Sequence, residues 1–532
     1  MALLRRQSDK AEALGKVELF SGLTKKELTA LARLSDEIDV PEGTTLATEG
    51  EHGRQVEVIL NGAAVVRRKG RKIAELGRGD VVGEISLVTH RPRNADVVTT
   101  APSTLLVLDG RSFDTVMADV DRVIVPGLTQ WQHPGFFAYF PSNASYPSIL
   151  GELLSAGLGV QGMSWVTSPA CTEVETLMLD WMRELLDLPE RFDSRSEHGG
   201  GVIQGTASEA TLVAILSARW RTTGGTVNAD GDTTALVAYA TSQAHSSIEK
   251  GLRIAGIGTE RIRVVPHDDS FAMRPDALAE MIAADRVAGL VPFFVCSTHG
   301  TTSSMAFDPT PAIGAICSSE NIWLHVDAAM SGIAALAPEF RWVNDGMAYA
   351  DSYCTNPHKW MGVNFDCDLY WTADRAALLG ALSILPEYLR SEAAEAGAVI
   401  DYRDWQIPLG RRFRALKLWF AIRCDGVDSF QTMIRRHVEL TQGLATWVAA
   451  DDRFEIVAPH PLNLLCLAVR ADDLDAANAA TDALVEAANA TGHALFTRTV
   501  LDGRSVLRIS IGARATERAH VDAAWNLLTT LA

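Results

Sequence analysis

Residues 322–360 read IWLHVDAAMSGIAALAPEFRWVNDGMAYADSYCTNPHKW and contain two strand-like segments, each followed by a reactive side chain. The apolar run IWLHV ends at Asp327, and a proline breaks the second strand two residues before Lys359. Similar isolated runs, TALVAYA (234–240) and GLVPFFVCS (289–297), alternate with helical segments earlier in the chain. This alternation predicts a mostly parallel sheet covered by helices, with Lys359 at its carboxyl edge.

Two further segments place polar groups after strand-like runs. GGGVIQGTASEATLVAILSAR (199–219) is a glycine-rich turn between a strand and a helix, and its Thr206, Ala207 and Ser208 stand at the positive helix N-terminus, which suits a phosphate. In TSQAHSSIEK, His245 follows the strand TALVAYA and could stack on a flat ring. Each feature also has an ordinary interpretation: a solvated lysine, an aspartate that caps a helix, a tight turn with a serine cap, and a structural histidine.

Eight strings of the sequence resemble, in order, those of one enzyme family. They are WQHPGFFAYFP, SPACTEVETL, QGTASEATL, SQAHSSIEK, HVDAA, NPHKW, NFDCD and YRDWQIPLGRRFRALKLWF. From about residue 114 to its end the chain resembles the group II pyridoxal 5′-phosphate (PLP) decarboxylases, specifically the aromatic L-amino-acid decarboxylase branch. The resemblance implies the α/β fold type I of PLP-dependent transferases with a small C-terminal α+β domain, PLP as cofactor, and a homodimer with the active site at the subunit interface.

The same resemblance implies a role for each residue of the site. Lys359 carries PLP covalently, Asp327 pairs with the pyridine nitrogen and keeps it protonated, and His245 stacks on the ring. Tyr388 stands where the family keeps a mobile catalytic tyrosine. Further cofactor contacts are implied for Thr206, Ala207, Ser208, Thr302, Asn356 and His358, and substrate contacts for Trp131, Tyr139, Phe140, Pro141 and Ser142.

The amino-terminal segment has a different pattern. Residues 16–109 contain short β-rich runs between closely spaced glycines, which predicts a small antiparallel roll or barrel. VVGEISLVTHRPRNADVVTT (81–100) resembles the phosphate-binding cassette of cyclic-nucleotide-binding domains. That resemblance assigns Glu84 to the ribose, Arg93 to the cyclic phosphate and amides near Gly83 to the same ligand, so cAMP is an expected partner. The alternative is that Arg93 and Glu84 pair with each other in a purely structural barrel.

The expected domains are a cyclic-nucleotide-binding-like domain (1–113), a PLP-binding large domain (114–434) and a C-terminal small domain (435–532), with no linker after the first. The predicted activity is the decarboxylation of aromatic L-amino acids to amines and CO2. Aldehyde synthases resemble the same family but carry phenylalanine where Tyr388 stands, so this tyrosine favours the non-oxidative reaction. The alternatives are an aromatic aldehyde synthase and a cyclic-nucleotide sensor with a catalytically silent decarboxylase scaffold.

The composition excludes several other classes of protein. The net charge is −18, and residues 1–115 carry 17 Lys+Arg against 17 Asp+Glu, so the acidic excess lies in the rest of the chain and opposes nucleic-acid binding. No helix-turn-helix follows the barrel, which disfavours a transcription factor. No apolar stretch reaches the roughly 18 residues of a membrane span, and charges interrupt the first residues, so a cytoplasmic location is expected. Seven scattered cysteines without a C-x-x-C pair argue against a disulfide framework or a zinc site.

Overall fold

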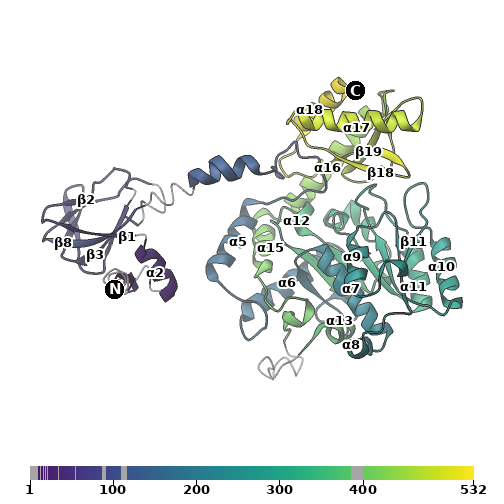
Figure 1. Cartoon of the computed structure of the whole chain (residues 1–532), viewed down its shortest axis with the longest axis horizontal. Coiled ribbons are helices and arrows are strands. Elements are labelled where there is room, and N and C mark those ends of the chain that lie inside the picture. Colours follow the sequence, from purple (N-terminus) through teal and green to yellow (C-terminus); the bar gives the residue numbers. More distant parts are fainter. Residues whose placement is uncertain are drawn as a thin grey trace. The chain divides into compact units, whose positions relative to one another are not determined.

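The structure is a computed structural model that describes residues 10–11, 14–15, 17, 20, 22–33, 35–53, 55–84, 86, 91–109, 117–384 and 399–532. The chain divides into two compact units, Met1–Thr129 and Gln130–Ala532, and each is described by itself (Figure 1). The limits expected for three domains, at residues 113 and 434, stay a prediction.

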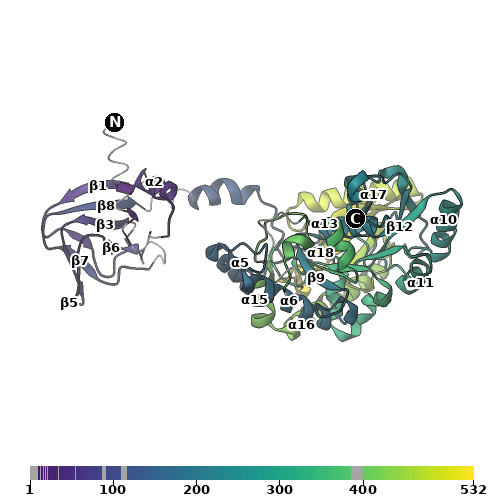
Figure 2. The same ribbon diagram turned by 90° about the horizontal axis from the view of Figure 1, so that it is seen from below.

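The amino-terminal unit is a roll of two four-stranded sheets with the orders β1-β8-β3-β6 and β2-β7-β4-β5 (Figure 2). All of their strand pairs are antiparallel, which confirms the predicted roll. Between the sheets, alternate side chains such as Ile59, Val97 and Leu105 form an apolar core. The elements are α2 (Lys25–Arg33), β1 (Ser35–Val40), β2 (Thr45–Ala47), β3 (Gln55–Asn61), β4 (Ala64–Arg68), β5 (Arg71–Leu76), β6 (Val81–Val82), β7 (Asp96–Thr99), β8 (Ser103–Asp109), η2 (Val120–Ile124) and η3 (Val125–Gly127).

The second unit contains a seven-stranded sheet with the order β11-β10-β12-β13-β14-β15-β9. Only β15 runs against the others, because it is antiparallel to both β14 and β9. The sheet matches the predicted parallel arrangement, and its central strands are buried on both faces, as helices on both sides require. The strands are β9 (Gly200–Gln204), β10 (Leu236–Thr241), β11 (Ile262–Val265), β12 (Val291–Thr298), β13 (Trp323–Asp327), β14 (Ser352–Thr355) and β15 (Asp368–Thr372).

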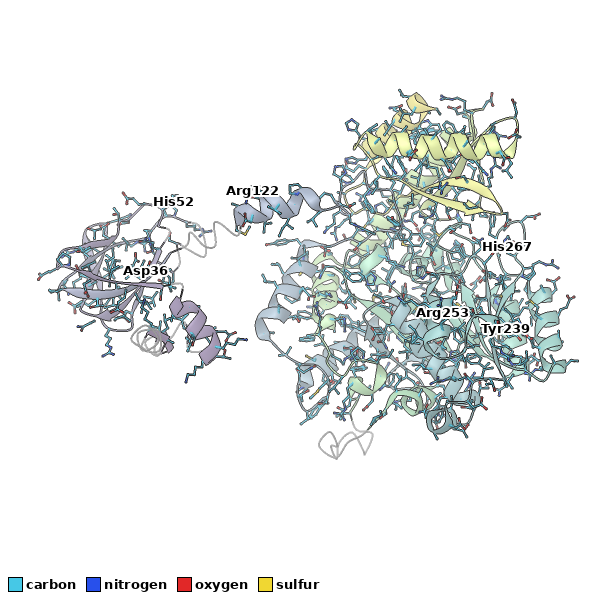
Figure 3. All side chains as sticks on the ribbon, viewed as in Figure 1. Asp36, His52, Arg122, Tyr239, Arg253 and His267 are labelled. Atoms are coloured by element: carbon cyan, nitrogen blue, oxygen red, sulfur yellow. The ribbon has the colours of Figure 1, made fainter. Side chains whose placement is uncertain are left out.

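Helices connect and cover these strands. Polar contacts also join the sheet to the helices: the buried Tyr239 of β10, labelled in Figure 3, donates a hydrogen bond to Asp285 of α10 (2.8 Å). The α-helices up to the C-terminal segment are α5 (Tyr146–Leu158), α6 (Pro169–Leu185), α7 (Ala207–Thr222), α8 (Val227–Asp230), α9 (Ser247–Ile254), α10 (Pro275–Val287), α11 (Thr310–Glu320), α12 (Pro357–Trp360), α13 (Arg375–Leu382) and α15 (Arg414–Asp425). Short 3-10 helices lie at η4 (Glu190–Phe192), η5 (Thr259–Arg261), η6 (Ser331–Leu336), η7 (Pro338–Asn344), η8 (Met347–Tyr349) and η10 (Tyr402–Trp405).

The C-terminal segment forms the expected smaller α+β layer. Its antiparallel sheet has the order β16-β17-β19-β18, and an apolar cluster including Leu465, Leu507 and Leu528 joins the sheet to the helices. The elements are α16 (Val427–Ala449), β16 (Phe454–Ile456), β17 (Leu464–Val469), α17 (Leu474–Ala490), β18 (Thr497–Leu501), β19 (Arg504–Ser510) and α18 (Arg518–Leu531).

Three general features of the described residues bear on function. None of their helices is both long and apolar enough to cross a membrane. Within the same residues, no group of His, Cys, Asp and Glu side chains is arranged to hold a metal ion. The seven cysteines are free thiols, and six of them are buried.

Candidate functional site

Five strands of the large sheet, β9, β10, β12, β13 and β14, end at the same edge because they run in the same direction. Open α/β sheets bind ligands at such an edge, where the loops after parallel strands meet. A cavity of about 220 Å³ lies there. Its lining brings together every cofactor residue expected from the sequence: Thr206, Ala207, Ser208, His245, Thr302, Asp327, Asn356, His358 and Lys359.

Lys359 lies in the short helix α12, directly after β14. Its amine is 5.5 Å from the centre of the Phe140 ring. Burial lowers the pKa of this amine, although the charge of Asp327 opposes the shift. A larger fraction of the lysine is therefore unprotonated at neutral pH, which is the form that attacks a carbonyl carbon.

Asn143 holds the backbone at Lys359 in place. Its side-chain nitrogen donates to the carbonyl oxygens of Lys359 (3.2 Å) and Gly512 (2.6 Å), and its oxygen accepts from the backbone N–H of Arg514 (2.9 Å). One buried amide thus ties the lysine loop to the C-terminal layer. Sequence reasoning missed Asn143 because its partners lie 216 and 369 residues away, so no local motif marks it.

Asp327 is the last residue of β13 and is only 4% exposed. Its Oδ1 accepts a hydrogen bond from the backbone N–H of Ala329 (3.0 Å). The helix-cap interpretation is wrong, because the following helical turn begins at Ser331 and has Met330 as its N-cap. A buried carboxylate on a cavity wall is stabilised by a cationic partner, and a protonated ring nitrogen would be one.

His245 and His358 line the cavity as neutral imidazoles. The Nδ1 atom of His245 accepts from the backbone N–H of Ser247 (3.1 Å), and that of His358 from the N–H of Cys367 (2.9 Å), so each ring carries its proton on Nε2. His245 keeps an exposed edge, and partial desolvation at the cavity lowers its pKa; burial lowers the pKa of His358 to about 3, and the Lys359 charge contributes in both cases. Both rings are therefore suited to packing and hydrogen bonding rather than to carrying charge.

The N-terminus of α7 provides the polar end of the cavity. Thr206 is its N-cap, and Ala207 and Ser208 form its first turn. A helix of 16 residues directs free N–H groups and a partial positive charge to this point, which favours an anion. Asn356 lines the same cavity, and its buried Oδ1 has no hydrogen-bond partner among the described residues.

A second cavity, of about 480 Å³, shares Lys359, His245 and Thr302 with the first. It is aromatic, because the ring of Trp131 stacks on that of Tyr139 with 5.5 Å between the ring centres. Trp131 is 39% and Tyr139 is 55% exposed, so the cavity is open to solvent at this side. All five expected substrate-pocket residues line it: Trp131, Tyr139, Phe140, Pro141 and Ser142.

Other lining residues were not expected. Phe365 lines both cavities, and its ring packs edge-on against His358 at 4.7 Å. The signal for it was its place in NFDCD, six residues after Lys359. Tyr388 lies outside the described residues. The remaining unexpected lining residues, most of them next to strand ends, are Thr298, Gly300, Ala329 and Met330.

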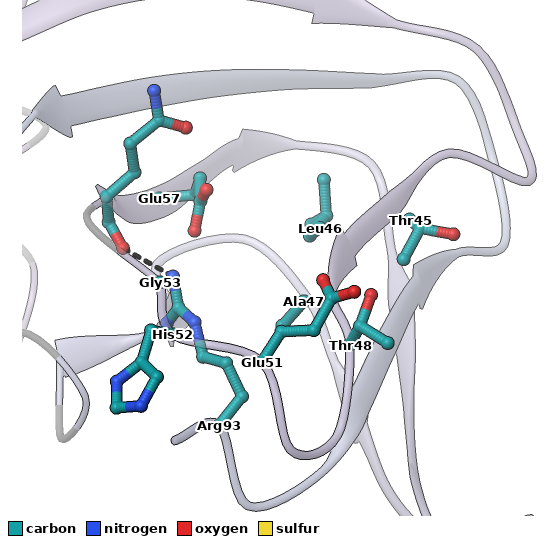
Figure 4. A pocket seen from close by; sticks show the side chains of 10 residues that line it. Thr45, Leu46, Ala47, Thr48, Glu51, His52, Gly53, Glu57 and Arg93 are labelled. Carbon is teal, nitrogen blue, oxygen red and sulfur yellow. Dashed lines mark hydrogen bonds between the residues drawn. The ribbon is translucent and has the colours of Figure 1, made fainter. Parts of the chain in front are cut away.

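The roll of the amino-terminal unit contains two cavities that share Arg93. The smaller, of about 180 Å³, is lined by the expected Gly83, Glu84 and Arg93. The larger, of about 470 Å³, includes Glu57 and Arg93 and is shown in Figure 4. Gly53 and Gly83 make room for the Arg93 side chain, because a Cβ atom at either would lie within 2.0 Å of it.

Arg93 has a different neighbour from the one expected in a structural barrel. Its Nη2 donates to the carbonyl oxygen of Gln55 at 2.7 Å, and its buried Nη1 has no partner among the described residues. Among the described residues of the roll, no ion pair joins Arg93 to Glu84. The nearby carboxyl is Glu57, whose pKa burial raises to about 7 against the opposing charge of Arg93.

Comparison with known proteins identifies both units. Residues 106–470 match the pyridoxal-dependent decarboxylase conserved domain, and residues 37–120 match the cyclic nucleotide-binding domain. The chain is 45% identical over 421 residues to tryptophan decarboxylase 2 of Oryza sativa subsp. japonica, covering 78% of this chain and 84% of the relative. It is 47% identical over 423 residues to phenylacetaldehyde synthase of Arabidopsis thaliana, covering 78% and 85%. The solved structure of Oryza sativa TDC with PLP and tryptamine superimposes with a TM-score of 0.76 at 40% identity, covering 79% and 87%.

The residues of the 220 Å³ cavity fit PLP in each of its chemical parts. The Lys359 amine, with its lowered pKa, suits the aldehyde of PLP, and the buried carboxylate of Asp327 suits its ring nitrogen. The neutral imidazoles suit the ring faces, and the N-terminus of α7 suits the phosphate. The family match covers more than half of the chain. The chain therefore belongs to the pyridoxal-dependent decarboxylase family, uses pyridoxal 5′-phosphate as its cofactor, and carries a cyclic nucleotide-binding domain at its amino-terminal end.

Proposed function

We propose that the protein converts aromatic L-amino acids to the corresponding amines and CO2. The observation that carries this proposal is the meeting of a polar cavity and an aromatic cavity at Lys359. The relative solved with tryptamine supports an aromatic side chain in the second cavity. A substrate with a second carboxylate, such as glutamate, would need an arginine to bind that group. Among the described residues that line this cavity there is no arginine, which favours an aromatic substrate.

In this proposal each residue has a stated task. PLP, when bound, supplies a ring that accepts electrons as the bond between Cα and the carboxylate breaks. Lys359 would hold the cofactor through its amine. Asp327 retains a proton on the ring nitrogen, and neutral His245 packs against the ring face. The amides at the start of α7, with Asn356, hold the phosphate.

The aromatic cavity orients the substrate and excludes water from the breaking bond. Trp131 and Tyr139 offer stacked rings to an aromatic side chain, while Phe140 lies beside the Lys359 amine. The exposure of Trp131 and Tyr139 supports a homodimer in which a second subunit covers this side of the cavity. Sedimentation of the purified protein should then give twice the mass of one chain, and a monomer that is fully active would contradict this part.

The direct test is release of CO2. Purified protein with PLP is incubated with tryptophan, tyrosine, phenylalanine and DOPA, and glutamate serves as the control that carries a second carboxylate. We expect CO2 and one equivalent of amine from at least one aromatic substrate and neither from glutamate. No CO2 from any of them would instead support a silent scaffold that serves the nucleotide-binding domain.

A second candidate, aromatic aldehyde synthesis, is favoured by the 47% identity to phenylacetaldehyde synthase. The two reactions differ in the fate of Cα after CO2 leaves. If a proton reaches Cα, the product is an amine; if O2 oxidises it, the products are aldehyde, ammonia and hydrogen peroxide. We propose that Tyr388 supplies this proton, on the strength of its position in the sequence.

Tyr388→Phe is therefore expected to slow amine formation by about 10²-fold or more, because the general acid is lost. O2 then competes for the unprotonated carbon, so aldehyde and peroxide should rise in equal amounts. Product chromatography with a peroxide assay measures both, and Tyr402→Phe, which removes another tyrosine hydroxyl from outside the cavity, is the control. Unchanged amine output without peroxide would remove Tyr388 from the mechanism.

For the amino-terminal unit, we propose that the cavity of Gly83, Glu84 and Arg93 binds cAMP and that binding modestly changes decarboxylation. A guanidinium with a free Nη1 supports recognition of a phosphate, and Gly83 allows the backbone to approach it. Regulation requires that cAMP bind two states of the protein with different affinity, so an effect of at most about fivefold is expected.

Arg93→Ala should weaken cAMP binding by about 10- to 100-fold, since one charge-assisted bond to phosphate is lost. Calorimetry measures the affinity, and Arg68→Ala, an exposed arginine on β4, is the control of equal charge. Absence of binding heat with the unaltered protein would make the roll structural. Binding that leaves both the rate and the substrate affinity unchanged would discard regulation alone.

A further inference from the structure

A buried carboxyl group at the start of β15, opposite Gln204 of β9, has no role in the site described above. Asp368 begins β15, is 0% exposed, and neither of its oxygens has a hydrogen-bond partner among the described residues. It does not line either cavity at the sheet edge. Burying an ionised carboxylate without partners is strongly destabilising. The group therefore either has a proton or has an unseen partner.

The side chains next to Asp368 in the sheet are amides, whose oxygens can accept a hydrogen bond. Asp368 is directly opposite Gln204 of β9, so their side chains share one face of the sheet. On its other side, Thr355 pairs with Leu369, the residue after Asp368, and Asn356 directly follows Thr355. The side-chain oxygens of Gln204 and Asn356 are buried and also have no donor among the described residues.

The orientation of Gln204 is determined by a separate contact. Its Nε2 donates to the carbonyl oxygen of Trp405 at 2.9 Å, so its Oε1 is left as an acceptor. An ionised Asp368 would accept only, so in the orientation these side chains have, its oxygens and those of Gln204 and Asn356 would be acceptors without a donor. A single proton on Asp368 converts this arrangement into a donor beside two acceptors.

The surroundings of Asp368 also favour its protonated form on balance. Burial raises the pKa of Asp368 well above its ordinary value, Asp327 and Glu209 raise it further, and Lys359 opposes them. Ionisation would place a second carboxylate near Asp327, whose own negative charge is needed at the ring nitrogen.

We propose that Asp368 is a positioning residue that remains protonated at neutral pH and donates a hydrogen bond to the side-chain oxygen of Asn356 or Gln204. Gln204 immediately precedes the turn that leads into α7, and Asn356 begins the loop of Lys359. A bond to either oxygen fixes an amide beneath the phosphate end of the cavity. The neutral acid thereby supports phosphate binding without adding negative charge beside Asp327 and Lys359.

The direct test is infrared difference spectroscopy of the apoprotein against Asp368→Asn at pH 7.5. A protonated carboxylic acid has a C=O band that an ionised carboxylate lacks. We expect this band in the unaltered protein and its loss in the variant, and a spectrum without it would overturn the proposal. The comparison does not depend on turnover, and asparagine has almost the same volume as aspartate.

Cofactor affinity tests the positioning role. Asparagine can donate from its amide, so Asp368→Asn should keep the PLP dissociation constant within about twofold, whereas Asp368→Ala should raise it about 10-fold or more by leaving the amides unpaired. Because Asn and protonated Asp are both neutral, the pH dependence of the visible absorbance of bound PLP should be the same in Asp368→Asn. A shift of that profile to lower pH would show that an anion has been removed near Lys359 and would overturn protonation. If Asp368→Ala does not fold, Asp368→Ser supplies the same comparison, and equal affinity in every variant would discard the positioning role.

Discussion

Replacing Lys359 by alanine is expected to abolish decarboxylation, with a loss of about 10³-fold or more, and to remove the visible absorbance of bound PLP. Among the described residues that line the two cavities at the sheet edge, Lys359 has the only primary amine. Its lowered pKa makes that amine reactive at neutral pH. Lys359 is the residue that binds the cofactor covalently, so its loss should reduce the rate far more than the loss of a single hydrogen bond or packing contact would.

Two measurements check this result. The first is the rate of CO2 release with saturating PLP, and the second is mass spectrometry of the peptide that holds the cofactor after borohydride reduction. Lys250→Ala is the matched control, because Lys250 is exposed on α9 and lines neither cavity. Decarboxylation near the original rate in Lys359→Ala, or a reduced adduct on another lysine, would contradict the site assignment.

The location of the site was predictable from local sequence because its residues follow strands. A buried strand reads as an apolar run, and when parallel strands are connected through helices their carboxyl ends meet at one edge. Asp327 and Lys359 each come directly after such a run, which is why two residues 32 positions apart line one cavity. The same logic identified Thr206 and His245, which follow β9 and β10.

Residues whose burial or hydrogen bonds depend on the order of the strands could not be predicted from the sequence. Asp368 reads as a polar residue at the start of a strand, and only its position between β14 and β9 makes it fully buried. The order places β9 beside β15, which are the first and the last strands of this sheet in chain order, and no local pattern contains that information. Asn143 belongs to the same class, since its hydrogen bonds connect distant segments.

The amino-terminal roll shows the same limit at Arg93. The cassette motif located this residue, and the expected structural alternative paired it with Glu84 because both lie in the same segment. In the folded roll, Arg93 donates instead to the backbone of Gln55, 38 residues earlier, and Glu57 is the carboxyl whose pKa its charge affects. β3 approaches the cassette only through tertiary folding, so a local interpretation had no means of finding this neighbour.

Asp327→Ala is expected to lose about 10²- to 10⁴-fold in decarboxylation rate, because no anion then keeps the ring nitrogen protonated. Asp327→Glu retains the charge in a longer side chain and should recover a large part of the activity. Asp327→Asn retains the size and the acceptor for the Ala329 N–H but has no charge, so it separates charge from packing. Rates for the three variants at saturating PLP and substrate measure the effect, and equal rates in Ala and Glu would contradict the electron-withdrawing role.

A second readout of the same three variants does not depend on turnover. The negative charge of Asp327 raises the pKa values of both Lys359 and His245, so its removal should lower both. In the apoprotein, the pH at which the Lys359 amine becomes half reactive toward an acylating reagent should therefore fall in Asp327→Ala and Asp327→Asn and stay near its original value in Asp327→Glu. Parallel losses of rate and lysine pKa in the two neutral variants would attribute the effect to charge. A loss of rate in Asp327→Asn with an unchanged lysine pKa would mean that Asp327 acts through geometry instead, since a missing anion at this position must be felt by the amine.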